Sequence, residues 1–114
     1  MGGVLSTNND TLILNLLTPK NDLVIPETSF IRFSVSGTPI TVTGLSGGTD
    51  GKRIVIANVG VDDISLTHND TGSTSANRLL NGSLGATKTL STNDTIEYIY
   101  DSVSQKWRYI GGSI

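Results

Sequence analysis

The chain has 114 residues, enough for one domain with a modest buried core. It contains no cysteine, which excludes disulfides, thiolate metal sites and thiol catalysis together, and suits folding in a reducing cytoplasm. Its formal charge of -2 and its scattered basic residues argue against nucleic acid or a membrane as a partner, because both attract a basic face.

The first half of the chain predicts a short arm followed by strands. Residues 1–10 are small and polar without periodicity, so we expect a flexible N-terminal arm over 1–11 and a single domain over 12–114. Phe30–Val35 alternates, which predicts that Ile31, Phe33 and Val35 face the core. Short apolar runs that end at turn residues predict four strands, at Leu12–Leu17, Leu23–Ile25, Phe30–Val35 and Ile40–Thr43.

The second half is punctuated in the same way, with a glycine-rich loop at Gly44–Gly51 and a polar loop at Asn69–Asn77. About nine short strands at intervals of roughly eight to twelve residues are typical of a sandwich or jelly roll. We therefore expect an all-β fold, a jelly-roll-like β-sandwich, and prefer it to a closed barrel because the loops differ in length. The further predicted strands are Arg53–Asn58, Ile64–Thr67, Arg78–Leu80, Ala86–Leu90, Thr95–Tyr100 and Lys106–Ile110.

The stretch from Gly44 to Gly111 resembles a β-module of virion proteins from tailed bacteriophages. The resemblance implies a place in a tail fibre, a spike or a small protein that decorates capsids. It does not imply a reaction. The segments that carry it are Gly47–Lys52, Ile64–Asn69, Ala76–Leu80, Asn93–Thr95, Tyr98–Asp101 and Lys106–Tyr109.

The sequence offers little that could carry catalysis. Gly47–Lys52 lacks the Gly-Lys-Ser/Thr ending and following helix of a phosphate loop, so we interpret it as a tight turn. His68 is the only histidine and has no second ligand at metal-binding spacing, so we interpret it as hydrogen-bonded within its own turn. Glu27 and Glu97 are far apart in the sequence. We expect no enzyme, no cofactor and no metal.

The aromatic side chains near the C-terminus have two interpretations. Tyr98 and Tyr100 share one strand face, as do Trp107 and Tyr109, so the two sets can pack against each other across a hairpin. Alternatively, an exposed Trp107 could stack on a sugar ring. We favour packing.

The function we expect is that of a phage virion structural protein. It would be a capsid decoration, or cement, protein that binds the major capsid protein on the capsid surface as a homotrimer and stabilises the shell by mass action. The protein would be made in the cytoplasm of the host bacterium. Candidate capsid or intersubunit contacts are the apolar residues of the arm and first strand: Val4, Leu5, Leu12, Leu14 and Leu16.

The alternative is a receptor-binding head-fibre or tail-fibre tip module that recognises a host surface glycan. Its candidate recognition loop is polar and follows a strand end. The residues expected to be exposed there are His68, Asn69, Asp70, Thr71, Ser73 and Asn77.

Overall fold

A computed structural model describes residues 12–114, and the expected arm over 1–11, with Val4 and Leu5, lies outside the described residues. The regular structure of residues 12–114 is β apart from one 3-10 turn at Ser75–Asn77, so the all-β prediction is confirmed. The strands are β1 (Ile13–Asn15), β2 (Leu23–Val24), β3 (Phe30–Ser34), β4 (Ile40–Val42), β5 (Leu45–Ser46), β6 (Arg53–Asn58), β7 (Ile64–Leu66), β8 (Leu79–Leu80), β9 (Lys88–Leu90), β10 (Thr95–Asp101) and β11 (Lys106–Ser113).

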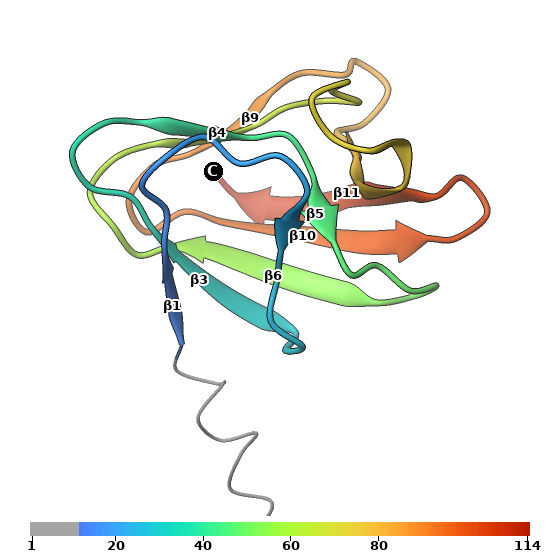
Figure 1. Ribbon diagram of the computed structural model, residues 1–114, viewed down its shortest axis with the longest axis horizontal. Helices are drawn as coiled ribbons and strands as arrows, with labels where there is room; N and C mark the ends of the chain where they lie inside the picture. The colour runs from blue at the N-terminus through green and yellow to red at the C-terminus, as the bar shows by residue number, and fades with distance from the viewer. Residues whose placement is uncertain (1–11) are drawn as a thin grey trace, which may run out of the picture.

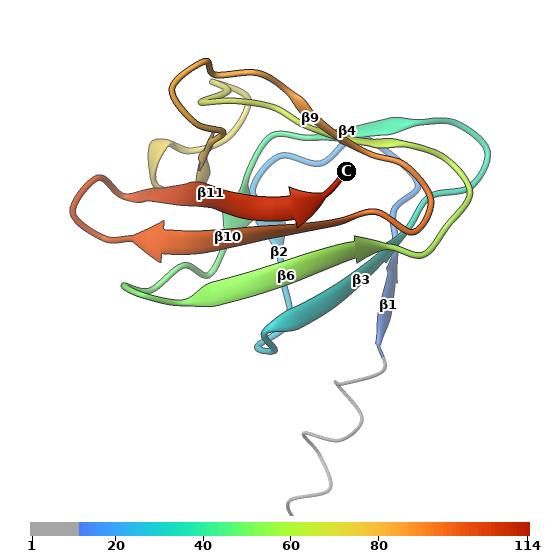
Figure 2. The same ribbon diagram turned by 180° about the vertical axis from the view of Figure 1, so that it is seen from behind.

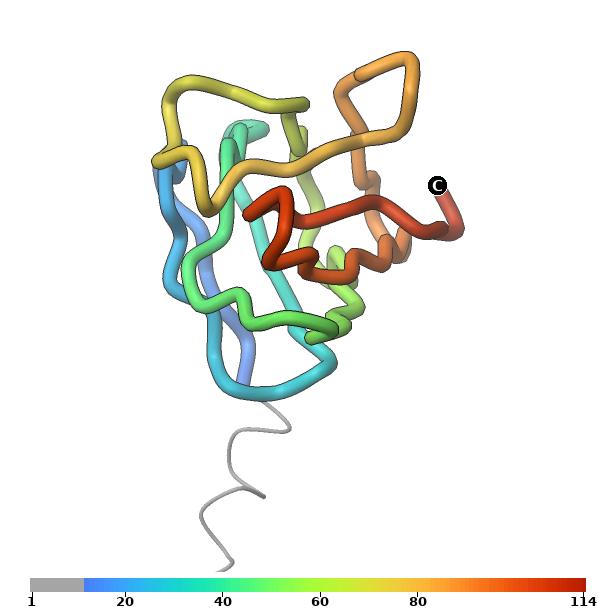
Figure 3. The backbone as a smooth tube through the Cα atoms, turned by 90° about the vertical axis from the view of Figure 1, so that its right-hand side faces the viewer, coloured from blue at the N-terminus to red at the C-terminus, as the bar shows by residue number. Residues whose placement is uncertain are grey.

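The chain winds in stacked coils. β1, β3 and β6 are parallel neighbours, and the pairs β2–β5 and β4–β7 are parallel as well. Ile13 lies beside Arg32, and Arg32 lies beside Ala57, so the chain returns to the same face in each new coil. The result is a short β-solenoid whose coils can be followed in Figures 1 and 3.

The prediction of a jelly-roll-like sandwich is therefore wrong in its strand pairing. Jelly rolls are antiparallel, because neighbouring strands come from hairpins and Greek keys. Here strands of successive coils run in the same direction. Strand spacing predicts where strands occur but does not identify their partners, so it could not distinguish the two architectures.

A C-terminal antiparallel hairpin completes the main sheet. β10 pairs with β6 on one side and with β11 on the other, giving a six-stranded sheet in the order β1-β3-β6-β10-β11-β8. A second sheet, β4-β7-β9, lies across the core from it (Figure 2). Seen from this side, β3, β6, β10 and β11 lie together below β4 and β9.

The core fills the space between these sheets. Ile31, Phe33 and Val35 are buried as the alternation of β3 predicted. Trp107 and Tyr98 are among its largest fully buried side chains. Every buried side-chain nitrogen and oxygen of residues 12–114 has a hydrogen-bond partner, so the core carries no unpaired polar side chain there.

Candidate functional site

Asp22 connects the first coil to the loop that precedes β8. Its Oδ1 accepts hydrogen bonds from the Thr74 amide at 2.8 Å and from Asn77 Nδ2 at 2.9 Å, and its Oδ2 accepts one from Thr74 Oγ1 at 3.1 Å. The hydrogen bond from Asn77, followed by those from Thr74, lowers the pKa of the Asp22 carboxyl. No local sequence pattern indicates this contact, because the partners are more than 50 residues apart.

Hydrogen bonds to the Asp70 side chain hold part of the predicted recognition loop in place. Asp70 accepts the Gly72 amide at 2.8 Å and Thr67 Oγ1 at 2.8 Å, and these bonds lower the pKa of the Asp70 carboxyl. Asp70 therefore shapes its own turn. Asn69 and Thr71 are exposed, as expected for a loop tip.

Two other residues of that predicted loop are not free to contact a ligand. The Ser73 side chain is only 2% exposed, and its hydroxyl lies 2.6 Å from Thr43 Oγ1 and accepts the Asp22 amide at 2.9 Å. Asn77 is half-buried and donates to Asp22. The prediction that Ser73 and Asn77 are exposed recognition residues is wrong, because both serve the contact between the coil and the loop.

His68 fixes the end of β8 instead of its own turn. Its Nδ1 accepts the backbone amide of Asn81 at 2.9 Å, so the bonding partner is 13 residues away and the predicted local bond is wrong. An accepting Nδ1 carries no proton, which places the proton of the neutral ring on Nε2. Within residues 12–114, no group of three or more His, Cys, Asp or Glu side chains is arranged to hold a metal ion.

Tyr98 and Asn81 form a buried polar pair just after the end of β8. Tyr98 donates its phenol proton to Asn81 Oδ1 at 2.6 Å, and Asn81 Nδ2 donates to the carbonyls of Leu66 and Ala86 at 2.9 and 3.0 Å. Burial raises the pKa of Tyr98 far above its usual range, so the phenol stays protonated and remains a donor. No sequence pattern revealed the buried hydrogen bonds of Asn81, because their partners lie on other segments of the chain.

The aromatic side chains pack as the favoured interpretation predicted. The ring centroids of Tyr98 and Tyr109 lie 6.1 Å apart and those of Tyr100 and Trp107 lie 5.0 Å apart, both in edge-to-face geometry. Trp107 is fully buried, and its Nε1 donates to the Leu45 carbonyl at 2.9 Å. It cannot stack on a sugar at the surface, so that alternative is wrong.

The loop Gly47–Lys52 is a tight turn, as predicted. The Lys52 amide donates to the Thr49 carbonyl at 2.9 Å, and the chain then enters β6 with no intervening helix. A Cβ atom at Gly48 would overlap the ring of Tyr100. Glycine is thus required there by close approach to an aromatic ring.

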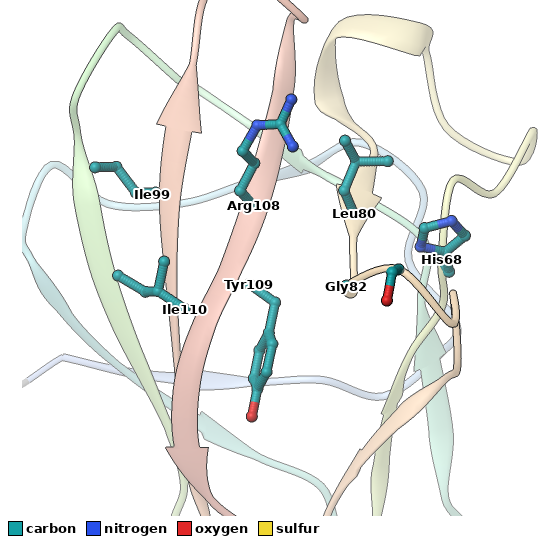
Figure 4. A pocket seen from close by; sticks show the side chains of 8 residues that line it. His68, Leu80, Gly82, Ile99, Arg108, Tyr109 and Ile110 are labelled. Carbon is teal, nitrogen blue, oxygen red and sulfur yellow. The ribbon is translucent and has the colours of Figure 1, made fainter.

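An open depression of about 440 Å³ lies beside β11, at the point where β8 ends (Figure 4). Arg108, Tyr109 and Ile110 contribute to it from β11, with Leu80 and Gly82 on its other side. His68 also lines it, which brings one predicted recognition residue to a cavity. Its volume is in the range of small-molecule sites.

Two arginine–carboxylate pairs lie on the outer face of the main sheet. Arg108 Nε donates to Asp101 Oδ2 at 2.9 Å, and Arg53 NH2 lies 3.1 Å from Glu97 Oε2. The hydrogen bond from Arg108, aided by Ser104 and the Val103 amide, lowers the pKa of the Asp101 carboxyl to about 2.

The first coil exposes apolar side chains at one end of the solenoid. Leu12 and Ile13 are exposed, as are Leu17 and Val24 at 76% and 74%. β1 pairs only with β3, so its other edge carries no strand among residues 12–114. Sheet edges and large exposed apolar side chains both favour association with other chains.

The predicted contact residues of this coil divide into two groups. Leu12 is exposed, as a contact residue must be, whereas Leu14 is partly buried against the core. Leu16 is 3% exposed and belongs to the core, so its assignment as a contact is wrong. Its amide donates to the Ser34 carbonyl at 2.9 Å, which turns the side chain inward.

The comparisons with known proteins add a fold likeness. The chain matches no known protein family and no curated protein. A solved structure described as a chaperone-substrate complex is 18% identical over 88% of this chain, with a TM-score of 0.50. This chain covers 17% of that chain, and the likeness concerns the fold alone. The described part of the protein contains no helix with the length and hydrophobicity of a membrane span.

Proposed function

We propose that this protein is a non-enzymatic structural module of a phage virion, and specifically a capsid decoration protein that binds the major capsid protein as a homotrimer. The resemblance of Gly44–Gly111 to virion modules suggests the setting. The observation that carries the proposal is the apolar end of the solenoid, where Leu17 and Val24 are exposed in the coil whose strand β1 has no second partner strand among residues 12–114.

The proposed mechanism is thermodynamic. A protein that binds assembled shells but not dissociated subunits stabilises the shell by mass action. A trimer on a local threefold position lets three weak contacts act together, since the second and third form at high effective concentration. The hydrogen-bonded core suits this role, because a rigid module loses little conformational entropy on docking.

Co-sedimentation with empty capsids tests the docking surface. We expect wild type to saturate the shells and the double variant Leu17→Ser, Val24→Ser to lose at least about tenfold in affinity, the effect of roughly 1.4 kcal/mol. Val103→Ser is the matched control, since this valine is 93% exposed on the hairpin between β10 and β11. Equal binding by the double variant and wild type would reject this surface.

Light scattering tests the homotrimer. A mass three times that of one chain is expected, and a monomer at concentrations that saturate capsids would contradict the trimer.

Deletion of residues 1–10 tests the predicted role of the arm, with reduced occupancy on capsids as the expected result.

A second candidate function is recognition of a host surface glycan by a receptor-binding module. The depression beside β11 favours it, because it places polar and aromatic side chains around a cavity of ligand size. A screen against host polysaccharide separates the two functions. Saturable binding to polysaccharide without binding to capsids would favour this second function over the first.

A further inference from the structure

The depression beside β11 is built by the way β8 ends. β8 pairs with β11 only at Trp107 and Arg108, although β11 continues to Ser113. At the next residue, Asn81, the backbone amide turns away to His68 Nδ1. The strand therefore stops, and the space it would have filled lies open beside Tyr109 and Ile110 (Figure 4).

The wall of the depression is held in a fixed shape. His68 is anchored at Nδ1, and a Cβ atom at Gly85 would lie 2.9 Å from its Cδ2. Gly85 also has a φ of +67°, so glycine meets both a steric and a conformational requirement there. Its amide closes the turn by donating to the Gly82 carbonyl at 3.1 Å. A preformed wall reduces the ordering cost of binding a ligand.

The lining combines apolar side chains with hydrogen-bond donors. Leu80 and Ile110 are apolar, whereas Arg108 is cationic, and the Tyr109 and Ser83 hydroxyls can each donate. Among residues 12–114, no carboxylate lines the depression. Arg108 donates to Asp101 through Nε, so its two terminal amino groups take no part in that hydrogen bond.

A second cation contacts a residue that lines the depression. Lys88 Nζ is 4.3 Å from the centroid of the Tyr109 ring. Two cations near apolar side chains favour a ligand that carries a negative charge, many acceptor oxygens and an apolar C–H face. A pyranose with a carboxylate has all three properties.

We propose that this depression binds an acidic sugar residue, a hexuronate-type pyranose, with its carboxylate at Arg108 and its C–H face on Leu80 and Ile110. The inference rests on the second proposed function, glycan recognition, and is independent of capsid docking. It narrows the class of glycan ligands to polysaccharides that contain carboxylated sugars.

An NMR titration of the isotope-labelled protein tests the inference. Galacturonate and glucuronate are compared with galactose and glucose, which carry a hydroxymethyl group in place of the carboxylate, and with acetate, which lacks the ring. We expect saturable shifts at the amides of His68, Gly82 and Arg108 with the uronates, and weaker binding at high salt.

Matched variants assign the effect to one cation. Arg108→Gln is expected to weaken uronate binding about tenfold or more through loss of a charge-assisted contact, with a smaller loss in Lys88→Gln. Arg53→Gln is the control, because Arg53 also forms an arginine–carboxylate pair on the sheet and does not line the depression. An equal loss in Arg53→Gln would overturn the assignment.

The sugar comparison separates the two levels of the proposal. Equal binding of galactose and galacturonate would overturn the acidic-sugar inference and leave glycan recognition intact. Shifts produced equally by acetate would show anion binding without sugar recognition and would overturn the inference. An absence of saturable shifts with every sugar would reject glycan recognition at this site, while capsid docking would remain testable by co-sedimentation.

Discussion

Replacement of Tyr98 by phenylalanine tests the buried polar pair under the depression. The ring and its packing remain, but Asn81 Oδ1 loses the proton that Tyr98 donates at 2.6 Å. Asn81 cannot turn away to find another donor, because its Nδ2 is bound to two backbone carbonyls. Leaving one buried acceptor unpaired costs about 1–3 kcal/mol of unfolding free energy.

Urea and thermal unfolding measure this cost. The urea midpoint should fall with an unchanged slope, and each kcal/mol should lower the melting temperature by about 4–8 °C in a domain of this size. Tyr109→Phe is the control, because Tyr109 is half-buried at the surface and should change stability by no more than about 0.5 kcal/mol. If Tyr98→Phe unfolds at the same urea concentration as wild type and Tyr109→Phe, the hydrogen bond from Tyr98 to Asn81 Oδ1 does not stabilise the fold.

Three further variants test other features. Gly48→Ala should destabilise the fold by about 1–3 kcal/mol in urea titrations, because the new methyl overlaps the Tyr100 ring; wild-type stability would contradict that close contact. The Asp101 pKa of about 2 lies below its usual 3.8, so its contribution to stability is complete above pH 4 and is lost as the pH falls toward 2. Melting temperatures should therefore show Asp101→Asn less stable than wild type at pH 7 and converging with it toward pH 2. Trp107→Ala should cost about 3–5 kcal/mol, and wild-type Trp107 should resist quenching by acrylamide in fluorescence measurements, because the ring is fully buried.

Local features of the fold could be predicted from the sequence. The alternation in Phe30–Val35 identified the buried face of β3 correctly. Tyr98 and Tyr100, predicted to share one strand face, are both buried. Alternation works here because each strand has one face in the core and one in solvent. The turn at Gly47–Lys52 could also be predicted, because glycine positions reflect local backbone requirements.

Partners distant in sequence could not be predicted. The parallel pairing of β3 with β6 depends on where the chain returns after a whole coil, and no local pattern records that. The hydrogen bonds that Asp22 accepts from the loop before β8, and that His68 accepts from Asn81, also join residues distant in sequence. The sequence predicted only part of the candidate site. His68 attracted attention as the only histidine, whereas nothing in the strand that contains Arg108 and Tyr109 indicated that these residues line a depression.

The stacking of coils has a consequence for how quickly the protein folds. Ile13 meets a neighbour 19 residues later at Arg32, and Phe30 meets one 25 residues later at Val55, so few of the sheet contacts in the first half form between near neighbours in the chain. Chains with such non-local topology fold in milliseconds to seconds. During that interval the apolar strands are exposed to other copies, so the nascent protein would benefit from a binding partner or from dilution while it folds.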